Sequence, residues 1–148
     1  MPTTTPIRDP DPATLAALGA GGKDLAAEAR AALDGARAQS GLARARALEQ
    51  FTAGYPGHPS ADDALVEAAR MRDREGDPDG SCEDFARASK EYPAGDAMPD
   101  ALAGLAACEA RRGRAAEARR LETRLAQDFP DSPAARRARA SAAQGAAP

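Results

Sequence analysis

The chain has 148 residues and a formal net charge of −3, a size that suits one domain with a moderate core. So small a charge does not favour binding to nucleic acid or to an anionic membrane surface. Hydrophobic residues make up 43% of the chain, but alanine dominates them and aromatic residues account for only 3%. Alanine, leucine, glutamate and arginine favour helices, whereas the β-branched residues typical of strands are scarce. The composition therefore predicts an all-α fold in which alanines let the helices approach closely.

The two ends of the chain are expected to lie outside the folded domain. Residues 1–22 contain four prolines and the run GAGG, so we predict a flexible lead, within which residues 11–15 could start a short helix. Residues 144–148 are expected to fray. No apolar run approaches the roughly 20 residues of a membrane span, and the N-terminus has no hydrophobic signal-peptide core. We expect no signal peptide in this chain, although a chain trimmed of its signal would begin in the same way.

A short phrase that occurs three times gives the chain its organisation. It reads GYP at 54–56, EYP at 91–93 and DFP at 128–130, with successive prolines 37 residues apart. Gly76 and Gly113 have the same separation. A fixed period in the range of about 20 to 50 residues is typical of a repeat array.

In chain order, the apolar residues recur at helical spacing and are interrupted by glycine and proline, so each unit is predicted to be a pair of helices. The units are expected at about 23–58, 60–95 and 97–132, followed by a capping helix at 134–143, all within a domain of residues 23–143. The interhelical break of the first unit falls at Gly41 rather than at Gln39. We therefore expect its first helix to be poorly registered with the other units.

Several residues in these units occupy places that are typical of one helical-repeat family. In the second unit, Pro93 closes the pair of helices. The small residue Ala69 then lies in the first helix of this unit, and Phe85 and Ala88 lie in its second helix. The third unit, closed by Pro130, matches at four places, namely Leu105, Ala106, Ala118 and Leu125. This pattern resembles the tetratricopeptide (TPR) repeat. Ser81 and Glu122 depart from it, at places where the family prefers alanine and a bulky apolar residue.

The connector DFPDSPAARRA at 128–138 is similar to that of TPR domains in bacterial cell-envelope proteins. These include the periplasmic TPR protein of the Tol–Pal system and the outer-membrane assembly lipoproteins. The resemblance implies a short superhelix that acts as a protein-binding scaffold and has no catalysis of its own. It also implies a periplasmic or outer-membrane-associated location.

The resemblance further implies that the first helices line a concave groove that binds a partner protein or peptide. The residues expected to face this groove are Asp63, Val66, Glu67, Arg70, Asp73, Arg74, Asp100, Ala103, Gly104, Ala107, Ala110 and Arg111. Those of the third unit form a small apolar patch able to accept a helix or an extended segment. The alternative is that the alanines of this patch have no role in binding and reflect only the composition of a GC-rich genome.

Two cysteines are the remaining residues with distinctive chemistry. In a TPR stack, the helices that carry Cys82 and Cys108 pack against each other, so a disulfide could form in an oxidising compartment. The alternative is a pair of buried free thiols. We expect no metal site, because His58 is the only other soft ligand, and no cofactor or catalytic residue.

Three functional hypotheses stay open at this point. The first is a non-catalytic scaffold of the bacterial cell envelope that binds a partner in the groove. The second is a self-associating structural module that stacks through acidic and basic ends, because residues 1–60, 61–100 and 101–148 carry net charges of 0, −7 and +4. The alternative explanation of these charges is that neighbouring units of the same chain attract each other within the stack. The third is a cytoplasmic adaptor of a secretion or motility system.

Overall fold

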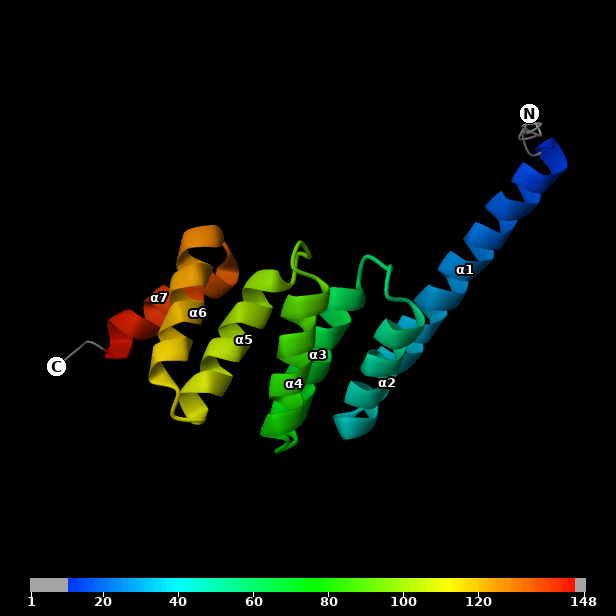
Figure 1. The fold of residues 1–148 in the computed structure, drawn as a ribbon. Helices are drawn as coiled ribbons and strands as arrows, with labels where there is room; N and C mark the ends of the chain where they lie inside the picture. Colours follow the sequence, from blue (N-terminus) through cyan, green and yellow to red (C-terminus); the bar gives the residue numbers. More distant parts are fainter. Residues whose placement is uncertain (1–10, 146–148) are drawn as a thin grey trace, which may run out of the picture.

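The computed structural model describes residues 11–145, with only the backbone described for residues 14–23. In this part of the chain there are seven α-helices and no strand, which confirms the all-α prediction. The helices are α1 (Pro12–Ala38), α2 (Gly41–Gly54), α3 (Ala61–Arg74), α4 (Pro78–Glu91), α5 (Met98–Arg111), α6 (Ala115–Asp128) and α7 (Pro133–Gly145). They stand side by side in chain order, with α1 at one end of the stack and α7 at the other (Figure 1). Within the described residues, no helix is both long enough and apolar enough to cross a membrane.

The helix boundaries repeat with the period of the sequence. The second helices of the three units, α2, α4 and α6, each span 14 residues and begin 37 residues apart. The first helices α3 and α5 also span 14 residues and have the same separation. The first helix of the first unit, which was expected to be poorly registered, ends at Ala38, one residue later than the repeat requires, while α2 keeps the register. The displaced Gly41 becomes the first residue of α2, with φ of +59°.

Glycines end the first helices of the second and third units. Gly76 and Gly113 have φ of +81° and +77°, in the left-handed region where side chains other than glycine are disfavoured. The residue after each glycine donates its backbone N–H back into the helix, from Asp77 to the Arg72 carbonyl and from Arg114 to the Glu109 carbonyl, at 2.8 Å in both cases. This arrangement satisfies carbonyls that the helix end would otherwise leave unpaired.

The first helix begins earlier than the sequence pattern suggested. It starts at Pro12 and continues through the glycines of residues 19–22, in a region expected to be a flexible lead. Proline is well placed as the first helical residue, because its fixed φ suits the helix and its missing N–H would have no partner there. Figure 1 shows this half of α1 extending beyond the rest of the stack. Residues 1–10 and 146–148, which belong to the expected lead and frayed tail, lie outside the described residues.

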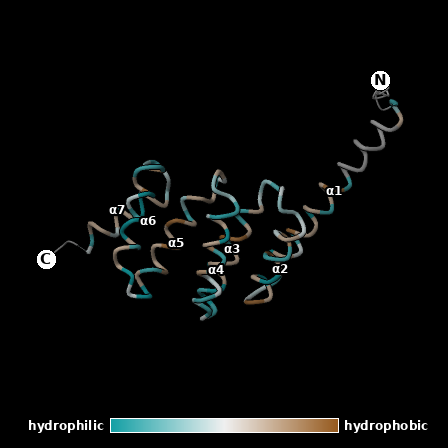
Figure 2. Tube along the Cα trace, viewed as in Figure 1, coloured by the Kyte–Doolittle hydropathy of each residue, from teal (hydrophilic) through white to brown (hydrophobic). Residues whose placement is uncertain are grey.

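Three clusters of buried apolar side chains follow one another along the stack. One joins α1, α2 and α3, the next joins α3, α4 and α5, and the last joins α5, α6 and α7. Their larger members are Leu33, Leu48 and Phe51 in the first, Leu65 and Phe85 in the second, and Met98, Leu102 and Leu125 in the third. Buried alanines fill the space between them, and in Figure 2 hydrophobic residues follow α5 while α4 and α6 carry longer hydrophilic stretches. Ala134 and Ala135 of α7 close the last cluster, as expected for a capping helix.

Candidate functional site

The first helices of successive units meet along one side of the stack. Four ion pairs connect them directly: Arg37 of α1 with Glu67 of α3, Arg70 of α3 with Asp100 of α5, Arg111 of α5 with Asp73 of α3, and Arg137 of α7 with Asp100. We call the surface formed by these residues, together with Asp63, Arg74, Ala107 and Ala110, the first-helix face. It is a continuous surface from α1 to α7.

Most of the residues expected to face a groove are accessible on this surface. Seven are exposed, namely Asp63, Arg70, Asp73, Arg74, Ala107, Ala110 and Arg111, and four are half-buried, namely Glu67, Asp100, Ala103 and Gly104. Val66 is the exception. It is only 3% exposed and lies in the second core cluster with Leu65 and Phe85, so its assignment to the groove was wrong. Its β-branched side chain helps to hold α3 against the neighbouring helices.

The small apolar patch of the third unit is narrower than expected. An added Cβ at Gly104 would lie 2.5 Å from the Phe85 ring, so this glycine serves the close contact between α5 and α4. Ala103 packs against the third core cluster. Only Ala107 and Ala110 are left as exposed small residues of this patch.

The ion pairs of the first-helix face have short separations. Arg70 lies 2.9 Å from Asp100, which also lies 2.9 Å from Arg137, so one carboxylate connects α3, α5 and α7. Arg111 lies 2.6 Å from Asp73. Each exposed pair contributes little stability by itself, but together they fix how one unit sits on the next.

The acidic segment, residues 61–100, and the basic segment, residues 101–148, contact each other within the stack. Asp73 and Asp79 of the acidic segment pair with Arg111 and Arg112 of the basic segment, and Asp100 also pairs with a basic-segment arginine. The acidic segment lies in the middle of the stack rather than at an end. This arrangement is that expected from complementarity between neighbouring units.

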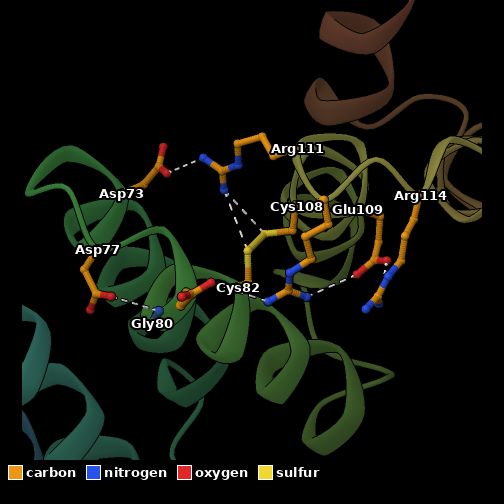
Figure 3. Close-up of polar contacts among 10 residues, drawn as sticks. Asp73, Asp77, Gly80, Cys82, Cys108, Glu109, Arg111 and Arg114 are labelled. Atoms are coloured by element: carbon orange, nitrogen blue, oxygen red, sulfur yellow. Dashed lines mark hydrogen bonds and ion pairs between the residues drawn. A yellow bond between two sulfur atoms is a disulfide. The ribbon is translucent and has the colours of Figure 1, made fainter.

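A disulfide joins the second and third units. Cys82 of α4 and Cys108 of α5 are bonded with their Cα atoms 5.8 Å apart, which fits the separation that a disulfide requires. Both residues are buried. Figure 3 shows Arg111 placed between this bridge and Asp73; its Nη2 atom lies 3.7 Å from the sulfur of Cys82 and 3.5 Å from that of Cys108.

Two equivalent positions carry the same ion pair with opposite signs. In the second unit Arg72 pairs with Asp77, and 37 residues further on Glu109 pairs with Arg114. Asp77 also accepts the Gly80 backbone N–H at the start of α4, and this hydrogen bond, with that from Arg72, lowers the pKa of Asp77. Figure 3 shows the contact of Asp77 with Gly80 and the ion pair of Glu109 with Arg114. The repeat therefore conserves the geometry of the pair but not its polarity.

A buried aspartate, Asp84, and a half-buried glutamate, Glu49, lie close together where the first two units meet. Arg72 of α3 donates to Glu49 of α2 at 2.5 Å and lies 3.3 Å from Asp84 of α4. Burial, followed by the neighbouring Glu49 carboxyl, raises the pKa of Asp84 to about 8, so this carboxyl holds a proton at neutral pH. Burial alone would raise the pKa of Glu49 as well, but the hydrogen bonds from Arg72 and Asp84 lower it. The proton on Asp84 and the guanidinium of Arg72 thus stabilise the neighbouring carboxyl groups of Asp84 and Glu49.

Sequence reasoning missed this acidic pair and part of the first-helix face. Arg37 could have been found from the period, because it stands 37 residues before Arg74, which in turn stands 37 residues before Arg111. Asp84 gave no such signal, since its equivalent in the third unit is Leu121.

The comparisons with known proteins leave the chain without a match. No family model, no curated protein and no solved structure matches it.

Proposed function

We propose that this protein is a non-catalytic scaffold of the TPR type that binds a partner protein or peptide along the first-helix face. The observation that carries the proposal is the continuity of this face, which runs across three units and the capping helix with charged side chains accessible along its length. An extended partner could contact several units at once and gain affinity from each.

The interlocked ion pairs support the proposal in a second way. Because Glu67, Asp73 and Asp100 are already engaged by arginines of neighbouring helices, these side chains are partly ordered before a partner arrives. A surface arranged in advance has less conformational entropy to lose on binding. The exposed Ala107 and Ala110 would allow the backbone of a partner to approach closely between the charged residues.

The disulfide supports a location in the bacterial cell envelope. Disulfides form and persist in oxidising compartments such as the periplasm and are rare in the cytosol, where thiols are kept reduced. The bond between Cys82 and Cys108 therefore favours a periplasmic scaffold over a cytoplasmic adaptor.

A pair of matched variants tests the binding proposal. Ala107 is exposed on the first-helix face and Ala116 is exposed on α6, so arginine at either position should leave the fold intact. Tagged wild type and both variants would be purified from the native host under identical conditions. We expect a partner that co-purifies with the wild type and with Ala116→Arg but is lost with Ala107→Arg. Loss of the partner with both variants, or with neither, would count against this face as the interface.

A further inference from the structure

A basic pocket lies on the first-helix face where α1, α2 and α3 meet. Its volume is about 290 Å³, and its lining consists of Arg37, Arg44, Glu67, Arg70, Met71 and Arg74. Four guanidinium groups surround one carboxylate in a protein whose overall charge is negative. Met71 is half-buried and supplies the one apolar side chain.

The arginines of this pocket are only partly neutralised by their surroundings, which for Arg37 include Asp63 and Asp34 as well as Glu67. Glu67 is shared, accepting from Arg37 at both of its oxygens and lying 3.5 Å from the Nη2 atom of Arg44. Arg70 pairs with Asp100 outside the pocket. Arg74 is exposed and has no ion pair among the residues that the structure describes. The pocket therefore holds more donors than its own carboxylate can satisfy.

The pocket is also not a by-product of the repeat. An arginine near the end of a first helix recurs in every unit and is favoured there by the helix dipole. Arg44 and Arg70 break the pattern. The equivalents of Arg44 are Ser81 and Ala118, and the equivalents of Arg70 are Leu33 and Ala107. Within the part of the chain that the structure describes, the junction of the first two units has arginine at all four places, whereas the next junction has arginine only at Arg74 and Arg111.

We propose that this pocket binds a carboxylate side chain of an acidic segment in the partner, an inference that rests on the proposed function. Arginine presents a planar fork of donors that matches a carboxylate, and Arg37 already binds Glu67 in this way through two nitrogens. Arg74 and the unshared donors of Arg44 offer the same geometry to a second carboxylate. The methylenes of a glutamate side chain would lie against Met71.

The contact already present in the pocket points to a carboxylate as the ligand. Glu67 accepts hydrogen bonds from Nε and Nη2 of Arg37, so this lining already holds a side-chain carboxylate, whereas binding of a phosphate is left as an outcome of the test. Asp63 lies near the Arg37 side of the pocket. Partial burial, followed by the carboxylates of Asp62 and Asp96, raises the pKa of Asp63, and Glu67 and Arg37 of the pocket also act on it. An incoming carboxylate is therefore expected at Arg74 and Arg44 and not beside Asp63.

Fluorescence anisotropy with short labelled peptides tests the inference. The probe is a glutamate-rich peptide with an amidated C-terminus, so that only side-chain carboxylates are offered, and its glutamine analogue is the reference. We expect the glutamate peptide to bind the wild type at least about 10-fold more tightly than the glutamine peptide, a difference of about 1.4 kcal/mol. The difference should shrink as salt is raised, because the arginines are accessible.

Arg74→Gln removes a guanidinium that has no ion pair to lose, so the fold should be unaffected. We expect this variant to bind the glutamate peptide at least about 10-fold more weakly, equivalent to about 1.4 kcal/mol. The control is Arg119→Gln, which removes an exposed arginine from α6 and should leave binding unchanged.

Three results would each overturn the inference. The wild type could bind the glutamate and glutamine peptides equally, the wild type and Arg74→Gln could bind the glutamate peptide equally, or the wild type could prefer a phosphoserine peptide of matched sequence. If Arg74→Gln still co-purifies with the partner that Ala107→Arg loses, the pocket assignment fails while the proposed function stands.

Discussion

Removing the bridge between the second and third units should destabilise the protein strongly. Alanine at both Cys82 and Cys108 would abolish the disulfide without placing new polar groups in the buried site. The two cysteines are 26 residues apart in sequence. For a loop of this length, the chain-entropy relation gives a loss of about 3.5 kcal/mol in the free energy of unfolding. In a protein of this size such a loss lowers the melting temperature by roughly 7–14 °C.

Urea unfolding followed by far-UV circular dichroism, with and without dithiothreitol, measures this loss. The wild type should unfold at lower urea when reduced, and the Cys82→Ala/Cys108→Ala variant should unfold near the reduced wild type whether or not reductant is present. The variant is thus its own control for any effect of the reductant. Two free thiols in unreduced protein, or a wild-type midpoint that does not respond to reductant, would refute the reasoning.

Two further predictions concern groups buried between helices. Because the pKa of Asp84 is about 8 in the folded protein and about 4 in an unfolded chain, the folded state holds the extra proton between these values, so stability should fall as pH rises from about 4 to about 8. Asp84→Asn removes this contribution, so urea unfolding at pH 5 and pH 8 should differ less in the variant than in the wild type, and an unchanged pH profile would contradict the assignment. Gly104→Ala would force a methyl group to within 2.5 Å of the Phe85 ring. This overpacking should lower the free energy of unfolding by roughly 1–3 kcal/mol, against which the higher helix propensity of alanine should raise it by about 1 kcal/mol. Gly35→Ala, which meets nothing within 4 Å, should show only the gain, and equal thermal shifts for the two variants would refute the packing argument.

The arrangement of the helices could be predicted because it depends on residues whose effect is local. Gly76 and Gly113 end helices through their backbone conformation, and the recurring proline after each second helix cannot continue one. These signals repeat at 37 residues, and so do the helix boundaries. The first unit lacks a glycine at the equivalent of Gly76, yet α2 keeps the register because Gly41 can adopt a positive φ at the start of the helix.

The site could be predicted only in part, because burial depends on the neighbouring unit. Val66 occupies a place on α3 that the resemblance to TPR repeats assigned to the groove, but it is buried among residues of α3, α4 and α5. Asp84 resembles an ordinary surface acid in the sequence. Its burial beside Glu49 and Arg72 follows from the packing of α3 against both α2 and α4, which no local pattern contains.

The claim that a partner binds along the first-helix face is tested most directly by site-specific photo-crosslinking in the native host. A photoreactive amino acid would replace Ala107 on the face in one protein and Ala116 on α6 in another, both at exposed positions. We expect a covalent adduct with a partner from position 107 and none from position 116. An adduct from position 116 alone, or equal adducts from both positions, would contradict it.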